Sequence, residues 1–407
     1  MEQEKKFLPV ILGGDIGCYS VARAFHEQYG VKSLAIGRYP MGATKNSKIL
    51  EFRAVPDLFD DQSMLRELTK VYEQYKDTGL VLILLGSNDT YARMIIENNE
   101  RLSEMFAVPY IKSDIMDILV KKEAFYETCV KHGIDFPKTH VFKKGDEDFS
   151  IDFDYPIILK PSSSMHYWKN PFEGMCKVYK AYDKEQALAI LSEMYRGGYP
   201  ENVILQEFIP GNDNEMRVLT CYSDRNAKVT MMCLGHVLLE EHTPTAIGNH
   251  AAIITEYDAE LFEKFRNFLE TIGYVGFSNF DLKFDVRDGK YKAFEVNLRQ
   301  GRSNYYVTGS GHNIARYVVE DRILENDLPC EEVTGESYWH VIPNRIVYRY
   351  VKNPELVGRV KRLVKQKKVS NSMVYSKDMS LMRRVFYVYY YFNHFKKFKK
   401  YYHPEKS

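Results

Sequence analysis

Two neighbouring stretches of the chain, FSNFDLKFD (277–285) and KAFEVNLRQGRSN (292–304), alternate polar and apolar residues. Side chains point to opposite faces in turn along a β-strand. The first strand therefore presents Asp281 on its polar face, and the second presents Glu295 and Asn297. The short turn VRDG joins the strands, so we expect the two polar faces to lie side by side.

The residue types on this shared face suit phosphate chemistry. Carboxylate and amide oxygens are ligands that Mg²⁺ prefers, and Asp281, Glu295 and Asn297 supply three of them. Arg299 and Arg302 follow directly and would neutralise the charge of a transferred phosphoryl group. The alternative is a hairpin with one solvated charged face. We favour a site because three ligands and two arginines converge.

The first 112 residues predict a doubly wound parallel sheet. LPVILGG (8–14), SLAIG (33–37) and LVLILLGS (80–87) are nearly continuous apolar runs separated by helical stretches. GGDIG (13–17) lies at a strand-to-helix turn, where it either binds an anion of the substrate or only makes a tight turn. The chain lacks both a complete dinucleotide fingerprint and a Walker-type phosphate loop.

The rest of the chain predicts an α+β region and a C-terminal extension. Residues 113–330 change to longer strands linked by hairpins, which is typical of α+β domains. Residues 331–407 form a basic, aromatic-rich extension. We therefore expect three domains, 1–112, 113–330 and 331–407.

Charge separates the extension from the body. Residues 359–400 hold thirteen Lys or Arg and one acid, which leaves 43 basic and 54 acidic residues elsewhere. Two interpretations stay open. The aromatic residues pack on the body while the basic residues attract a polyanionic substrate, or the extension also makes peripheral contact with an anionic membrane. No nucleic-acid-binding module supports a nucleic-acid partner.

The six scattered cysteines favour neither a disulfide framework nor a zinc ribbon. No signal peptide and no apolar run of the roughly 18–20 residues that span a bilayer is recognisable. We expect a cytoplasmic protein.

The strand pair resembles the ATP-grasp superfamily, whose signature is an acid on one strand and Glu-x-Asn-x-Arg on the next. The resemblance implies ATP and Mg²⁺ as cofactors. It also implies that Lys122 and Lys160 reach the nucleotide phosphates, that residues 162–174 form the loop over the triphosphate, and that Lys177 follows that loop. Taken singly these lysines read as surface residues, but their order along the chain favours the site.

The same resemblance places adenine at the strand VILQEFIPG (203–211). Gln206 would lie near the adenine amino group, and the backbone of Glu207 and Ile209 would bind the edge of the ring. Asp213 matches the acid that bonds the ribose hydroxyls.

A narrower resemblance covers nearly the whole chain. Phrases such as PVILGGDIGCYSVARAF, QEFIPGNDNEMRVL and MMCLGHVLLEEHTPTAIGN resemble the bacterial D-aspartate ligases of peptidoglycan synthesis. The resemblance implies that ATP phosphorylates the β-carboxylate of D-aspartate. The lysine ε-amine of a nucleotide-linked precursor, UDP-MurNAc-pentapeptide, then attacks the acyl phosphate. Arg299 and Arg302 would stabilise both the phosphoryl charge and the tetrahedral oxyanion.

The residues that bind the amino acid are less clearly marked. Five residues in polar stretches are candidates: His236, Thr243, Thr245, Asn249 and Ser303. A lone histidine such as His236 is more often a packed strand residue than a base.

Two other functions compete with a D-aspartate ligase. One is a related ligase for a different acid or amine, and the other is a nucleotide-binding scaffold without catalysis. The presence of all the predicted metal ligands and arginines disfavours the scaffold. The sequence leaves the oligomeric state open.

Overall fold

The N-terminal stretch forms a parallel sheet, as the apolar runs predict. In the computed structural model, four strands pair in parallel in the order β3-β2-β1-β4. Strand β1, one of the two inner strands, is fully buried from Val10 to Leu12 because it has a neighbour on each side. The elements of this stretch are β1 (Phe7–Leu12), α1 (Ile16–Tyr29), β2 (Ser33–Gly37), β3 (Leu50–Ala54), α2 (Asp61–Tyr75), β4 (Val81–Gly86), α3 (Asp89–Glu97) and α4 (Asn99–Ser103).

The helices that follow β1 and β4 begin with side-chain caps. Asp15 caps α1 by accepting a hydrogen bond from the amide of Cys18, and Asn88 caps α3 through the amide of Tyr91. Gly13 stands between β1 and α1 with φ of +141°, where a Cβ atom would also collide with Ser87. These turns fix the positions of three polar side chains, those of Asp15, Ser87 and Asn88.

The structure describes residues 6–163, 167, 175–176, 178–243 and 246–402, which cluster into two compact units. Unit 1 comprises Met1–Ile115, Asn212–Asp281 and Asn297–Ser407, and unit 2 comprises Met116–Gly211 and Leu282–Val296. Strands β12 (Gly276–Asp285) and β13 (Lys290–Asn297) and helix α5 (Ser113–Val120) each contribute residues to both units. The three-domain division drawn from the sequence stays a prediction.

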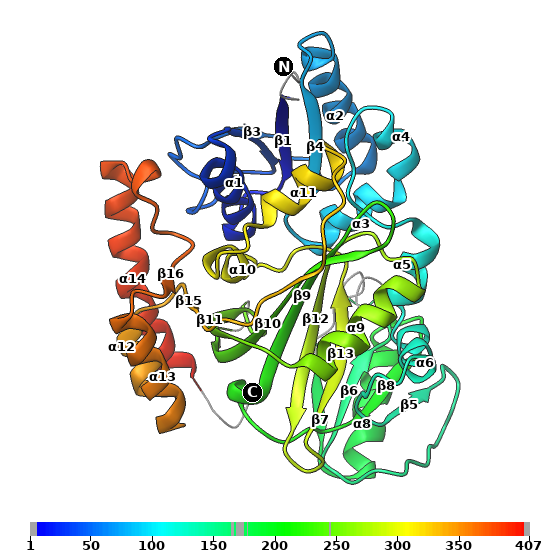
Figure 1. Ribbon diagram of the computed structural model, residues 1–407. Helices are drawn as coiled ribbons and strands as arrows, with labels where there is room; N and C mark the ends of the chain where they lie inside the picture. The colour runs from blue at the N-terminus through cyan, green and yellow to red at the C-terminus, as the bar shows by residue number, and fades with distance from the viewer. Residues whose placement is uncertain (1–5, 164–166, 168–174, 177, 244–245, 403–407) are drawn as a thin grey trace. The chain divides into compact units, whose positions relative to one another are not determined.

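The larger sheet has the strand order β13-β12-β9-β10-β11-β15-β16, and β14 pairs with β10. Strands from the C-terminal extension thus complete this sheet, which the sequence did not indicate because they are only two or three residues long. The remaining elements of unit 1 are η1 (Asp213–Glu215), β9 (Met216–Ser223), β10 (Val229–Glu240), β11 (His250–Glu256), α9 (Ala259–Thr271), α10 (Tyr305–Gly309), α11 (Ile314–Arg322), β14 (Glu331–Glu332), β15 (Tyr338–His340), α12 (Asn344–Tyr350), α13 (Pro354–Lys365), β16 (Val369–Ser370), η2 (Ser376–Asp378) and α14 (Leu381–Tyr401), the last drawn in red in Figure 1.

Unit 2 contains a four-stranded sheet in the order β5-β8-β6-β7. A break at Lys121 separates α5 from α6. The elements of this unit are α6 (Lys122–Lys131), β5 (Thr139–Phe142), β6 (Ile157–Pro161), β7 (Tyr179–Ala181), α8 (Lys184–Arg196) and β8 (Val203–Glu207).

Among the described residues, all the cysteines are free and no helix is long and apolar enough to cross a membrane.

A buried charge network joins the extension to the large sheet. Glu256 at the end of β11 accepts hydrogen bonds from Arg217 at 3.1 Å, from Arg359 of α13 at 2.9 Å, and pairs with His236 at 2.7 Å. Burial raises the pKa of Glu256, but His236 and the two arginines outweigh it and lower the value from 4.5 to about 2. The ionised form of Glu256 therefore stabilises the fold.

We predict that Glu256→Gln lowers the free energy of unfolding by about 3 kcal/mol at neutral pH, since the folded pKa lies below the ordinary one. This contribution is complete above pH 4.5 and is lost as the pH falls through about 2. Urea unfolding of both proteins between pH 7 and pH 3 measures it. Glu263→Gln, at an exposed position of α9, is the control and should change stability by less than about 0.5 kcal/mol. Equal losses in the two variants at pH 7 would contradict the assignment.

Candidate active site

The end of the predicted metal hairpin has the geometry that the alternation implies. Asn297 Nδ2 donates to Asp281 Oδ2 at 3.1 Å and to the carbonyl oxygen of Asn279 at 3.2 Å. The amide thus points its nitrogen at the neighbouring strand β12. Glu295 lies two residues before Asn297 on β13, so the two side chains share a face of that strand.

The donor set suits a hard divalent cation. Two carboxylates and one amide oxygen match the ligands of Mg²⁺, which completes its octahedron with water and phosphate oxygens. No group of three or more His, Cys, Asp or Glu residues that could hold a metal occurs in the described part of the chain. The magnesium site of Asp281, Glu295 and Asn297 stays a prediction.

Arg299 is held in place by an acid at the start of α3. Its Nη2 donates to Asp89 Oδ2 at 2.7 Å, and its Nη1 donates to the carbonyl oxygen of Gln300 at 3.1 Å. Burial alone would lower the pKa of Arg299, but Asp89, Asp281 and Asp15 raise it. Its Nε atom is buried without a hydrogen-bond partner among the described residues. The guanidinium is therefore charged, oriented and able to bind one more acceptor.

Arg302 is oriented by a second, more deeply buried acid. Its Nη2 donates to Glu241 Oε1 at 3.1 Å, and Glu241 is only 5% exposed. Pairing with a buried carboxylate fixes the direction of the guanidinium and offsets the cost of burying the acid.

Both arginines line a cavity of about 550 Å³ that lies wholly within unit 1. Its polar lining comes from the turns after β1, β2 and β4, the loop before β11 and the segment after β13. Those residues are Asp15, Arg38, Ser87, Asn88, Asp89, Asn249, Arg299 and Arg302. Phe59, Phe386 and Tyr390 supply aromatic surface. A volume of this size suits a small metabolite.

The residues expected to bind the nucleotide gather partly around one tyrosine of unit 2. Gln206 Nε2 donates to the hydroxyl of Tyr126 at 2.8 Å, and Lys160 Nζ donates to the same oxygen at 3.4 Å. Burial raises the pKa of Tyr126, so the hydroxyl stays protonated and donates to the carbonyl oxygen of Phe294. Lys122 begins α6, four residues before this tyrosine.

The other expected nucleotide residues lie in two different settings. Glu207 of β8 forms an ion pair with Arg287 at 2.7 Å, and Ile209 is buried. Asp213 of unit 1 is 3% exposed, and its Oδ2 accepts from the amide of Glu240 and pairs with His242 at 3.0 Å. Lys177 and most of the predicted loop 162–174 lie outside the described residues. The nucleotide assignments stay predictions.

The residues predicted to bind the amino acid lie in different parts of the structure. Asn249 lines the cavity with the two arginines. Both ring nitrogens of His236 are engaged, one by Glu256 and the other by the carbonyl oxygen of Asn214. Ser303 is 4% exposed and is not part of the cavity lining. Thr245 lies outside the described residues.

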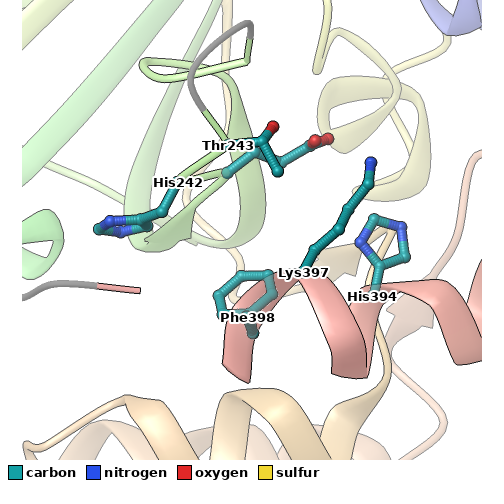
Figure 2. Close-up of a pocket in the computed structure, with 6 residues that line it drawn as sticks. His242, Thr243, His394, Lys397 and Phe398 are labelled. Carbon is teal, nitrogen blue, oxygen red and sulfur yellow. The ribbon is translucent and has the colours of Figure 1, made fainter. Parts of the chain in front are cut away.

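Thr243 lines a different and much smaller pocket. Figure 2 shows it with His242 on one side and with His394, Lys397 and Phe398 of α14 on the other. The volume is about 10 Å³, which is room for one water molecule. This pocket is too small for a substrate.

Sequence reasoning missed most of the cavity. Asp15 belongs to GGDIG, where an anion site was one of two open interpretations, but Arg38, Asp89 and the residues of α14 carried no recognised motif. Phe386, Tyr390 and His394 recur at intervals of four residues, and this spacing is the signal that could have placed them on one helix face.

Comparison with known proteins supports the family resemblance drawn from the sequence. A D-aspartate ligase of Enterococcus faecium (strain Aus0004) is 36% identical over 392 residues, which are 94% of this chain and 93% of that protein. No family model matches the chain.

Solved structures of low sequence identity share the fold. An N5-carboxyaminoimidazole synthetase from Staphylococcus aureus complexed with ADP has a TM-score of 0.57 and 13% identity, over 87% of each chain. An L-amino acid ligase from Bacillus licheniformis has a TM-score of 0.55 and 14% identity, over 79% of this chain and 75% of that one. These matches confirm the predicted ATP-grasp fold with its α/β and α+β parts.

Proposed function

This chain belongs to the D-aspartate ligase family, and we propose that it joins the β-carboxylate of D-aspartate to an amine at the expense of ATP. The family match over 94% of the chain is the observation that carries the proposal. The oriented pair Arg299 and Arg302 beside a metabolite-sized cavity supports it, because a carboxylate substrate needs cationic partners there.

The reaction has two steps. A carboxylate oxygen of D-aspartate attacks the γ-phosphorus of ATP, the bond to the bridging oxygen breaks, and ADP leaves. The amine nitrogen then attacks the carbonyl carbon of the β-aspartyl phosphate, loses a proton and expels phosphate. The product is an amide.

Arg299 and Arg302 would act in both steps. Negative charge gathers on the phosphoryl oxygens in the first step and on the tetrahedral carbonyl oxygen in the second. Guanidinium groups already fixed by Asp89 and Glu241 need little reorganisation to stabilise that charge.

The metal would be held by Asp281, Glu295 and Asn297, as proposed from the sequence. When bound, Mg²⁺ would neutralise charge on the phosphate oxygens of ATP. Arg299 lies two residues beyond Asn297, and its Nη2 is 3.5 Å from Asn297 Oδ1. This short distance supports a guanidinium that would act beside the bound metal.

The nucleotide would be bound by Lys122, Lys160, Lys177, Gln206, Glu207, Ile209 and Asp213. The cluster of Gln206, Lys160 and Tyr126 supports part of this set, because the tyrosine hydroxyl holds the amide and the ammonium on one side of the small sheet.

The acceptor that we propose is the lysine ε-amine of the peptidoglycan precursor UDP-MurNAc-pentapeptide. A different acid or amine is the alternative within the same chemistry.

We also propose a weak membrane contact through the exposed basic residues of α14, which are Arg384, Lys396, Lys399 and Lys400. Failure of the chain to sediment with anionic phospholipid vesicles at low salt would contradict this contact.

The ligase proposal predicts acyl phosphate formation with D-aspartate. Protein supplied with ATP, Mg²⁺, hydroxylamine and one amino acid at a time should yield a hydroxamate with D-aspartate. The measurement is the colour of the ferric hydroxamate together with release of ADP. A hydroxamate formed only with another acid would favour the related-ligase alternative. If none of the acids gives ADP release or a hydroxamate, both hypotheses are contradicted.

The metal assignment predicts a large effect of Glu295→Gln. The substitution keeps the size of the side chain but removes the charge, so we expect kcat to fall by at least about 100-fold, within the range seen when one group that stabilises transition-state charge is removed. The circular dichroism spectrum should be unchanged. Glu185→Gln, on the exposed side of α8, is a matched control that should keep wild-type activity. Wild-type turnover of Glu295→Gln would show that the metal assignment is wrong.

A further inference from the structure

The cavity of unit 1 is built from both ends of the chain. Asp15 caps α1 and Asp89 begins α3 in the N-terminal stretch, whereas Phe386 and Tyr390 belong to α14 of the C-terminal extension. A helix of the C-terminal extension thus forms one wall of the space into which Arg299 and Arg302 project.

The position of this wall is fixed by buried polar contacts. Arg383 of α14 is 4% exposed, and its Nη1 donates to the carbonyl oxygens of Ala43 and Lys45 at 2.7 and 3.1 Å. The same guanidinium lies over the ring of Tyr19 at 4.5 Å and pairs with Asp378 at 3.3 Å. The first turn of α14 is therefore anchored to the N-terminal sheet three residues before Phe386.

Close packing sets the depth of the wall. A Cβ atom added to Gly42 would lie 2.1 Å from the ring of Phe386, so only glycine leaves room for that ring. The rings of Phe386 and Tyr390 stack with centroids 5.9 Å apart, and Tyr390 meets His394 edge-on at 4.4 Å. These three side chains lie four residues apart on one face of the helix.

The groups that face this wall suit an amino acid with two carboxylates. The lining holds three guanidiniums, those of Arg38, Arg299 and Arg302, which can bind anions. It also holds two carboxylates: Asp15 accepts from the amide of Cys18 and Asp89 accepts from Arg299, and each has further acceptor positions for an ammonium group. Two buried donors of the lining have no hydrogen-bond partner among the described residues: Ser87 Oγ and Arg299 Nε. Buried polar atoms are rarely left without a partner, so both point to a polar ligand.

We propose that this cavity is the donor-acid site, and that Phe386 and Tyr390 of α14 set the length of the acid that it accepts. The inference rests on the proposed ligase function and adds the residues that discriminate between substrates. Aromatic side chains that line the same cavity as the fixed arginines limit the space left for the acid. The shorter dicarboxylate then fits, and one more methylene group would press against the rings.

The test compares D-aspartate with D-glutamate, which is longer by one methylene group. In Phe386→Ala, the ratio of kcat/KM for D-glutamate to that for D-aspartate, measured by hydroxamate formation, should rise at least about tenfold. Phe392→Ala is the matched control, because this side chain is on the same helix but 62% exposed, and its ratio should stay at the wild-type value. An unchanged ratio in Phe386→Ala would overturn the proposal.

Loss of folding must be separated from loss of selectivity. The melting temperature of each variant shows whether it is folded, and Phe386→Leu, which keeps apolar bulk, replaces Phe386→Ala if the latter is unfolded. In Phe386→Leu we expect the ratio of kcat/KM for D-glutamate to that for D-aspartate to rise as well, by a smaller factor.

Binding separates this proposal from the ligase function. Titration calorimetry with D-aspartate, Mg²⁺ and a non-hydrolysable ATP analogue measures Kd without turnover. If D-aspartate binds but no hydroxamate forms, the ligase function fails, and the variants are compared by Kd for the two acids, with the same ratio expected. If a hydroxamate forms but the ratio is the same in all variants, the ligase function stands and the wall proposal fails. If D-aspartate neither binds nor reacts, the donor-site assignment is wrong.

Discussion

The structure of unit 1 depends on one buried carboxylate, that of Asp378. It is fully buried and accepts hydrogen bonds from the hydroxyl of Tyr19 at 2.9 Å, from Ser47 Oγ at 2.8 Å and from the amide of Lys48. Arg383 pairs with it from α14. Removing one partner of such a buried pair typically costs about 3–5 kcal/mol, because the other charge is left unpaired. This carboxylate therefore ties the C-terminal extension to the N-terminal sheet.

That attachment changes how the extension is understood. Its charge and aromatic content alone fit either packing on the body or contact with an anionic membrane. In the structure one face of α14 is used for packing, since Arg383, His394 and Phe398 are buried. Burial lowers the pKa of His394 to about 4, so this imidazole is neutral at physiological pH and fits beside Glu241 as part of the packed face. The other face carries exposed basic residues, so packing and a surface contact are compatible.

The fold and the position of Asp281 beside Asn297 could be predicted from the sequence because their signals are local. Alternation over ten residues identifies the strand with Asp281, and apolar runs identify the parallel sheet. The cavity could not be predicted, because Tyr19 and Asp378 are 359 positions apart and no periodicity links them. His236 illustrates the same limit. Its ring nitrogens are engaged by Glu256 and by the carbonyl oxygen of Asn214, which are 20 and 22 positions away in sequence.

The central claim is that an acid donor lies between the arginines that follow β13 and the aromatic wall of α14. A crystal structure of the protein with D-aspartate and a non-hydrolysable ATP analogue tests this claim most directly. We expect one carboxylate within hydrogen-bond distance of Arg299 or Arg302, and the carbon chain of the acid in van der Waals contact with Phe386 or Tyr390. D-Aspartate bound elsewhere in the protein, with this cavity filled only by solvent, would contradict it.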